Sequence, residues 1–94
     1  MYAVMRHYTG ASALADALVQ RQQEVTQLIN TVPGFRAYYA LRTGDGKVAT
    51  ITICDDQAGT QESSRRAATW VRENMSGGSI SPPEIIEGET FLNF

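Results

Sequence analysis

The hydrophobic pattern of this chain centres on two strand-like stretches joined by a short turn. FRAYYALRT and KVATITIC are rich in aromatic, β-branched and other apolar residues, and a Gly-Asp-Gly turn separates them. Glycine supplies the positive φ angles that a tight hairpin requires. The pattern therefore predicts a β-hairpin with strands over Phe35–Thr43 and Lys47–Cys54. Successive residues of a strand point to opposite faces, so Tyr38 and Tyr39 are expected on different sides of the sheet.

A helix is predicted before the hairpin. Apolar residues recur there at mostly three-, four- and seven-residue spacings, which place them on one face of a helix. Ser12 is a suitable N-cap, and Pro33 followed by Gly34 is a suitable stop. We therefore expect one helix of roughly five turns over Ser12–Asn30. Its apolar stripe consists of Leu14, Leu18, Val25, Leu28, Ile29 and Val32.

A second amphipathic stretch follows the hairpin. Asp56 or Thr60 can cap its N-terminus, and Trp70 lies on its apolar stripe. The run Ser76–Ser79, with the sequence Ser-Gly-Gly-Ser, is expected to end this second helix.

Both ends of the sequence read as strands, over Tyr2–Tyr8 and Glu84–Phe94. The predicted order is then β-α-β-β-α-β, in one domain over residues 1–94. This order is typical of the ferredoxin-like α+β fold, in which a four-stranded antiparallel sheet carries two helices on one face. In the first strand, Arg6 and His7 are expected on opposite faces.

The two faces of the predicted sheet share an unusual property: both carry large apolar side chains. Two helices cover only one face, and a face left to water should be polar. A monomer would leave a wide apolar patch exposed, which usually marks an interface. We therefore expect a homodimer in which two copies pack sheet to sheet about a twofold axis.

Composition narrows the class of protein further. The chain has 94 residues, of which 43% are hydrophobic and 19% charged, and a net charge of −2. This balance offers no electrostatic footprint for nucleic acid, and the apolar runs are far shorter than the ~20 residues of a membrane helix. No signal-peptide core precedes the first strand, so a cytoplasmic protein is expected. The single cysteine, Cys54, cannot form an internal disulfide and is expected to be buried.

Four stretches in order carry a resemblance to a known family: YAVMRHY, VPGFRAYYALRTGDG, VATITICDDQAGTQES and EIIEGETFLNF. The chain resembles the dimeric α/β-barrel superfamily, and within it the small antibiotic-biosynthesis-monooxygenase-like (ABM-like) proteins. The step Val32-Pro33-Gly34-Phe35, between helix end and strand, is its most recognisable piece.

The resemblance implies a dimer whose two sheets form a barrel, with a ligand pocket between the sheet and the helices. Some such proteins oxidise aromatic polyketides without a cofactor, and others degrade haem. The haem-degrading members use an Asn on the first strand together with a Trp and a His. Here the first strand has no Asn, Trp70 lies in the second helix and the only His is His7. Haem degradation is therefore not carried over.

Candidate catalytic residues come from the strands and from the second helix. His7 is the one side chain that can act as a general base near neutral pH, although a lone histidine on a strand is more often structural. Tyr38, Tyr39 and Trp70 are candidates for orienting an aromatic substrate, with core packing as the alternative. Arg6 and Arg42 can stabilise negative charge on a substrate. The alternative for these arginines is pairing with Glu84, Glu87 or Glu89 across strands or across the dimer interface.

Two functions from different classes follow. The first is cofactor-independent monooxygenation of a small aromatic or quinone-type molecule in an apolar pocket under the helices. The second is a non-catalytic homodimer that binds a small ligand or acts under stress. No metal-ligand spacing and no phosphate-binding loop occurs, so neither hypothesis includes a metal or cofactor.

Overall fold

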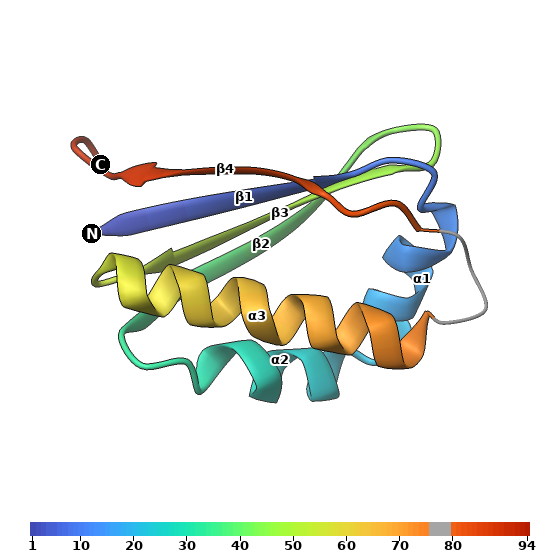
Figure 1. Cartoon of the computed structure of the whole chain (residues 1–94), viewed down its shortest axis with the longest axis horizontal. Coiled ribbons are helices and arrows are strands. Elements are labelled where there is room, and N and C mark those ends of the chain that lie inside the picture. The colour runs from blue at the N-terminus through green and yellow to red at the C-terminus, as the bar shows by residue number, and fades with distance from the viewer. Residues whose placement is uncertain (76–79) are drawn as a thin grey trace.

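The computed structural model describes residues 1–75 and 80–94 and contains one antiparallel sheet with its helices on one face (Figure 1). The sheet order is β2-β3-β1-β4, which is that of the ferredoxin-like fold expected from the sequence. The elements are β1 (Tyr2–Tyr8), α1 (Ser12–Gln20), α2 (Gln22–Asn30), β2 (Phe35–Gly44), β3 (Lys47–Cys54), α3 (Gln57–Asn74) and β4 (Glu84–Glu89).

The predicted hairpin is confirmed, with β2 one residue longer than expected. Gly46 has a φ of 68°, in the left-handed region that glycine adopts at no steric cost. Tyr38 pairs with Thr52 and Tyr39 with Ile51. Since residues that pair across strands lie on the same face, this register decides which side chains meet the helices.

The prediction of one continuous helix over Ser12–Asn30 is wrong. The chain bends at Arg21, whose φ of −110° and ψ of 32° separate α1 from α2. On a straight helix, Arg21 would lie three residues after Leu18 and four before Val25, on the same face as the apolar stripe. The helix is interrupted at this charged residue, which is exposed, and Val25 and Ile29 of α2 are buried in the core. The cap also differs: the N-cap of α1 is Ala11, whose backbone N–H is bonded to the Gly46 carbonyl at 2.8 Å.

Of the two N-caps predicted for helix α3, Asp56 is the one found in the structure. The Asp56 carboxylate accepts a hydrogen bond from the Gly59 N–H at 3.1 Å, which satisfies one of the free donors of the first turn. At the other end, the predicted stop at Ser76–Ser79 lies outside the described residues.

The last strand is shorter than predicted: β4 ends at Glu89 rather than at Phe94. Among the described strands, β4 pairs only with β1, where Glu89 pairs with Tyr2. The N–H of Thr90 still donates to the Met1 carbonyl at 2.7 Å, one residue beyond the last strand pair, Tyr2 with Glu89. Apolar and polar residues keep alternating after Glu89, but a β-strand forms only where a neighbouring strand provides hydrogen-bond partners for its backbone.

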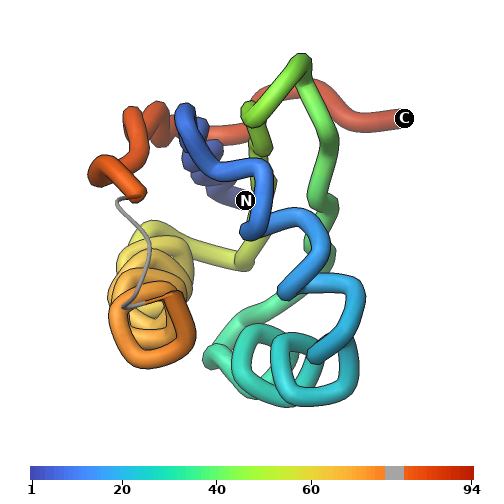
Figure 2. The backbone as a smooth tube through the Cα atoms, turned by 90° about the vertical axis from the view of Figure 1, so that its right-hand side faces the viewer, coloured from blue at the N-terminus to red at the C-terminus, as the bar shows by residue number. Residues whose placement is uncertain are grey.

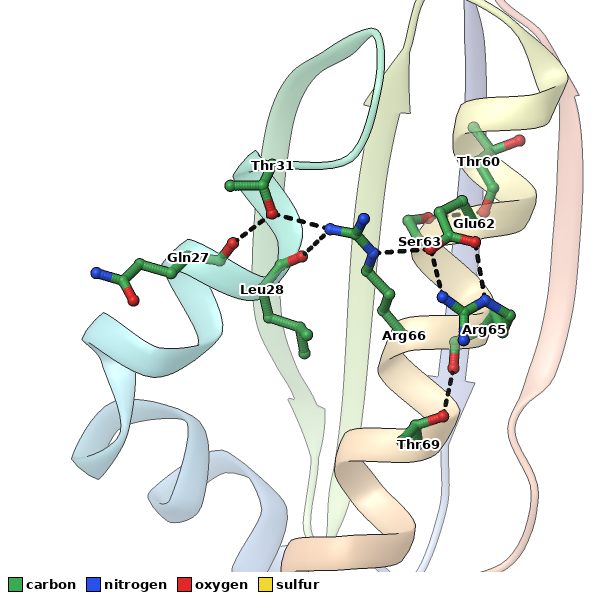
Figure 3. Close-up of polar contacts among 9 residues, drawn as sticks. All are labelled: Gln27, Leu28, Thr31, Thr60, Glu62, Ser63, Arg65, Arg66 and Thr69. Atoms are coloured by element: carbon green, nitrogen blue, oxygen red, sulfur yellow. Dashed lines mark hydrogen bonds and ion pairs between the residues drawn. The ribbon is translucent and has the colours of Figure 1, made fainter.

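A polar clamp on the surface ties α3 to the end of α2 (Figure 3). Arg66 donates to the Glu62 carboxylate at 2.8 Å, and to the Leu28 carbonyl and the Thr31 hydroxyl at 2.9 Å each. Arg65 donates to the same carboxylate at 2.8 Å. Hydrogen bonds from Arg65 and then Arg66 lower the pKa of Glu62 to about 2. Each guanidinium of this clamp is therefore matched by an acid.

The hydrophobic core lies between the sheet and the helices. It contains buried residues from every layer: Tyr8, Ala11, Leu14, Val25, Ile29, Val48 and Trp70. Within residues 1–75 and 80–94, no helix combines the length and the apolar character needed to cross a lipid bilayer.

Candidate active site

Arg6 is the most unusual residue of the core. It lies in the middle of β1 on the helix-facing side of the sheet, and only 1% of its surface is exposed. Its neighbours on this side of β1, Val4 and Tyr8, are also buried. Arginine is almost never fully buried unless it is paired, so the partners of Arg6 decide what this residue does.

Among the described residues, the hydrogen-bond partners of the Arg6 side chain are all hydroxyl groups. No Asp or Glu of residues 1–75 and 80–94 forms an ion pair with it, so the expected pairing with the glutamates of β4 is wrong for this residue. Two bonds go to β3 and two to α3, where small side chains leave room for the guanidinium. Arg6 donates to Thr50 (3.2 Å), Thr52 (2.7 Å), Ser63 (3.2 Å) and Ser64 (3.0 Å).

Hydroxyl groups satisfy the N–H donors of Arg6 but leave its charge uncompensated. Taking a charged group out of water costs several kcal/mol, and a hydrogen bond to a charged group returns roughly 1.5–3 kcal/mol. Burial lowers the pKa of Arg6, but a guanidinium remains protonated at neutral pH. The interior thus holds a positive charge that no acid of the described residues neutralises. An anionic group brought to this place would gain more than one bound at the surface.

Two tyrosines accompany Arg6 on the helix-facing side. Tyr8 lies two residues further along β1, and Tyr38 is paired with Thr52 on the neighbouring strand. Burial raises the pKa of both phenols, while the nearby Arg6 charge acts in the opposite direction. Both tyrosines are therefore neutral near pH 7 and can donate hydrogen bonds.

Trp70 closes the interior behind these tyrosines. It is buried, and its indole N–H donates to the Glu24 carboxylate of α2 at 2.9 Å. Tyr8, Tyr38 and Trp70 line a cavity of about 20 Å³, which is room for about one water molecule. A buried Trp70 is compatible both with core packing and with a role in a pocket wall, so its burial does not separate the two. The small cavity favours the core role.

A larger space opens beside this cavity. A groove of about 480 Å³ lies between α3 and the segment that leads into β4, within the usual size range of small-molecule sites. Arg6 and Tyr8 line it from the sheet, and Ser64 and Arg72 line it from α3. The remaining lining is apolar and consists of Ala68, Val71, Met75, Ile80, Pro82, Pro83 and Ile85, together with Ser81.

The other predicted site residues are not part of this arrangement. His7 and Tyr39 lie on the outer face of the sheet, opposite Arg6 and Tyr38, and the His7 Nε2 is 3.2 Å from the Thr43 hydroxyl. Arg42 is exposed, 3.8 Å from the Asp16 carboxylate of α1. Within the described part of one chain, the ion-pair partner of Arg42 is thus Asp16 and not a glutamate of β4, and pairing across a dimer interface stays a prediction.

Sequence reasoning missed the hydroxyl groups around Arg6. No role was predicted from the sequence for Thr50, Thr52, Ser63 or Ser64. The available signal was a face that combines an arginine with two threonines on adjacent strands, which predicts a buried polar cluster.

The described part of the chain offers no group of three His, Cys, Asp or Glu side chains that would hold a metal ion. Cys54 is buried, as expected, and burial raises the pKa of its thiol, with the charges of Asp55 and Asp56 acting in the same direction. This thiol is therefore poorly suited to act as a nucleophile.

Comparisons with known proteins agree with this architecture. No protein-family model and no curated protein matches the chain. Among solved structures, a protein of unknown function from Nitrosomonas europaea is 24% identical, with a TM-score of 0.74 over 99% of this chain and 91% of the other. A monooxygenase from Streptomyces coelicolor in complex with nanaomycin D is 18% identical, with a TM-score of 0.71 over 99% and 89%.

A third solved structure is SnoaB, a cofactor-independent oxygenase from Streptomyces nogalater. It is 17% identical to this chain, with a TM-score of 0.64 over 98% of this chain and 94% of the other. Likeness at these identities establishes the fold. The resemblance read from the sequence is confirmed at that level: the chain has the ferredoxin-like α+β fold of the ABM-like monooxygenases.

Proposed function

We propose that this protein is a cofactor-independent monooxygenase that oxidises a small phenolic or quinone-type molecule. The observation that carries the proposal is the buried charge of Arg6, which lines the groove beside α3 and has no acid partner in the described part of the chain. Oxygenases of the same fold support the reaction class. The substrate enters the groove with its phenol oxygen toward Arg6 and its ring against the apolar wall.

The reaction needs dioxygen and no other co-reactant. A phenol and one dioxygen give a quinone and one water. One oxygen atom forms the new carbonyl group, and the other leaves as water with the two hydrogens lost by the phenol. The four electrons that reduce dioxygen come from the aromatic ring. The first step is ionisation of the phenol, since the electron-rich phenolate is the form that passes electrons to dioxygen.

Arg6 promotes this ionisation because its charge stabilises the phenolate and lowers the pKa of the bound substrate. The proton leaves to water through the open groove. Neutral Tyr8 donates a second hydrogen bond to the phenolate, and Arg72 adds positive charge at the groove. Tyr38 and Trp70 are positioning residues, because they pack behind Tyr8. His7 has no part in this scheme.

A phenol that changes colour on ionisation tests the role of Arg6. We expect the protein to bind 4-nitrophenolate and to lower the pKa of the bound probe. In Arg6→Met, affinity for the probe should fall about 10- to 100-fold, the range for a lost hydrogen bond to a charged group. Affinity for nitrobenzene, which carries no ionisable group, should not change. Absorbance titrations with both probes measure these affinities.

Arg65→Met is the matched control, since it removes an exposed guanidinium from α3 that is not part of the groove lining. It should leave both affinities unchanged. Equal binding of 4-nitrophenolate by wild type and Arg6→Met would contradict the anion site. Oxygen-electrode measurements with a panel of phenols and hydroxyquinones then test the reaction itself, with quinone and water as products.

The second candidate is a non-catalytic protein that binds a small aromatic anion at the same groove. The observation that favours it is the small space between Tyr38 and Trp70, which leaves no room for a substrate ring within the core. Oxygen uptake separates the two functions: binding without oxygen consumption across the panel supports the non-catalytic one.

The proposal includes a homodimer formed through the outer face of the sheet. That face carries Met5 of β1, Tyr39 and Leu41 of β2, and Ile86 of β4, all exposed in the single chain. Exposing such an apolar surface to water is unfavourable, and a second copy related by a twofold axis would bury it. His7 then lies within the interface, on the opposite side of the sheet from the groove.

A further inference from the structure

The small cavity beside Trp70 (the core cavity) has a lining that suits an apolar molecule better than water. Its volume is about 20 Å³, and its lining comes from β1, β2 and β3 and from α1, α2 and α3. Figure 2 shows α3 in yellow and orange beside α2 in cyan, with the strands above both helices. Seven of the lining residues are aliphatic: Leu14, Leu18, Val25, Leu28, Ile29, Ala67 and Val71.

A water molecule is a poor occupant of the core cavity. A buried water makes roughly two to four hydrogen bonds, typically to polar groups that would otherwise lack a partner. Aliphatic side chains offer none, and no buried side-chain nitrogen or oxygen of residues 1–75 and 80–94 lacks a hydrogen-bond partner. Cavities with apolar walls instead take up small apolar molecules such as xenon. The core cavity is too small for an aromatic ring, so a diatomic gas is the guest that fits.

The hydroxyl groups of the lining connect the core cavity to Arg6. Thr50 accepts a hydrogen bond from Arg6 at 3.2 Å, and the charge of Arg6 acts on the phenols of Tyr8 and Tyr38. Tyr8 and Val71 also line the groove beside α3, so the cavity and the groove share these two side chains as a wall. A molecule in the core cavity is therefore adjacent both to the groove and to the buried positive charge.

We propose that the core cavity is a binding site for dioxygen. This inference rests on the proposed function, in which dioxygen is the second substrate, and it leaves the balance of that reaction unchanged. The phenolate enters the groove from solvent, whereas dioxygen is held among aliphatic side chains on the other side of Tyr8 and Val71. Dioxygen has neither a charge nor a dipole, so apolar surroundings hold it better than water does. Electrons passed to it make it an anion, which the charge of Arg6 stabilises.

Quenching of tryptophan fluorescence tests whether dioxygen enters the core cavity. Trp70 is the only tryptophan of the chain and lines the cavity, and dioxygen quenches an excited indole on contact. Ala67→Leu fills the cavity from α3 at a position that is not part of the groove lining. The quenching constant for dioxygen should fall about fourfold, the change in affinity when one methylene-sized apolar contact is lost.

Ala58→Leu is the matched control, because it makes the same change on the exposed surface of α3, outside the cavity lining. It should leave quenching by dioxygen unchanged. Acrylamide, which is too large for the core cavity, should quench the wild type and both variants equally. Unequal quenching by acrylamide would reveal a general opening of the core instead of a filled cavity.

Methyl relaxation in the wild type keeps the inference testable if Ala67→Leu does not fold. Dioxygen is paramagnetic and speeds the relaxation of the methyl protons that it contacts. Leu14 lines the core cavity, whereas Val4 is equally buried but lies outside the lining. Under dioxygen pressure, nuclear magnetic resonance should show a several-fold larger gain in relaxation rate for the Leu14 methyl groups than for those of Val4.

Turnover provides the third measurement. In Ala67→Leu, the KM for dioxygen should rise about fourfold, while the Kd of 4-nitrophenolate stays the same. Equal quenching in Ala67→Leu and wild type, or equal relaxation at Leu14 and Val4, would overturn the dioxygen site and leave the proposed function intact. A wild type that consumes no oxygen with any phenol would overturn the proposed function instead. Quenching and relaxation, which need no turnover, would then still decide whether the core cavity binds dioxygen.

Discussion

The two faces of the sheet invert the usual distribution of polar and apolar side chains. Under the helices, Arg6, Thr50 and Thr52 are buried although they are polar or charged. On the outer face, Leu41 and Ile86 are exposed although they are apolar. An antiparallel sheet of a monomeric domain normally does the opposite. Each departure costs stability in an isolated chain, so each points to a molecule that binds there.

The two departures point to different kinds of partner. A buried charge is matched by a ligand that brings the opposite charge, and the groove beside α3 is open to one. A broad exposed apolar face is matched by another macromolecular surface. The proposed ligand site and the proposed dimer interface therefore lie on opposite sides of one sheet, and variants on one side should leave the other intact.

The largest effect is expected on the outer face. Met5→Lys places a charge at the centre of the proposed interface, on a strand flanked by β3 and β4. Because two lysines would be buried in a twofold dimer, the dimer Kd should rise at least about 100-fold. The monomer should stay folded, since Met5 is partly exposed in it. Sedimentation and circular dichroism measure the two quantities.

Glu73→Lys supplies the control, because it changes the net charge more than Met5→Lys does, but on the exposed surface of α3. It should not affect the dimer. A Met5→Lys chain that dimerises like wild type would show that the outer face is not the interface. Binding of 4-nitrophenolate should survive in both variants.

A smaller effect is expected for the stability of Arg6→Met, and its sign distinguishes a ligand-binding role of Arg6 from a structural one. The substitution removes a buried charge that no acid compensates and replaces it with an apolar side chain. The free energy of unfolding should therefore change by less than about 1 kcal/mol or increase, while the affinity for 4-nitrophenolate falls about 10- to 100-fold. Arg66→Met, which breaks the clamp to Leu28 and Thr31, should instead lower it by about 1 kcal/mol. Urea denaturation measures both.

A loss of more than about 3 kcal/mol in Arg6→Met would assign Arg6 a structural role. In that case the hydroxyl cluster of Thr50, Thr52, Ser63 and Ser64 would depend on the guanidinium for its own hydrogen bonds. The comparison with Arg66 would then fail, because both arginines would stabilise the fold.

The smallest effect concerns the buried tyrosines at alkaline pH. Burial raises the pKa of Tyr8 and Tyr38 above the value of about 10 in the unfolded chain. The unfolded state thus loses protons that the folded state keeps. Stability should be complete below about pH 10 and fall as pH rises through the folded pKa values. Tyr8→Phe and Tyr38→Phe should each make this fall less steep. Urea denaturation between pH 9 and 11 measures the free energy of unfolding of the three proteins. An equal loss of stability with pH in the wild type and both variants would contradict the prediction.

Local pattern was sufficient for most of the fold. The bounds of β1 and β3 follow from their runs of aromatic and β-branched residues, and the hairpin turn follows from glycine. Two errors came from the same limit of a pattern. The apolar spacing over Ser12–Asn30 does not show that the helix is interrupted at Arg21, and alternation through Phe94 does not show that the pairing of β4 with β1 stops at Glu89. Both depend on a neighbour in space.

Only part of the candidate site could be predicted from the sequence. Alternation along β1 already separates Arg6 from His7, and alternation along β2 separates Tyr38 from Tyr39. Alternation does not say which face the helices cover. Once α3 lies over Arg6, the candidates on its side, Tyr38 and Trp70, share the interior with it, and His7 and Tyr39 do not.

The sequence by itself determined the order of elements, the alternation of each strand and the apolar character of both sheet faces, because these depend on neighbouring residues along the chain. Only the tertiary structure decided that Arg6 is buried among Thr50, Thr52, Ser63 and Ser64, which lie 44 to 58 residues away from it. The physical reason is that burial and charge compensation are properties of the space around a side chain. That space is created when distant segments pack together.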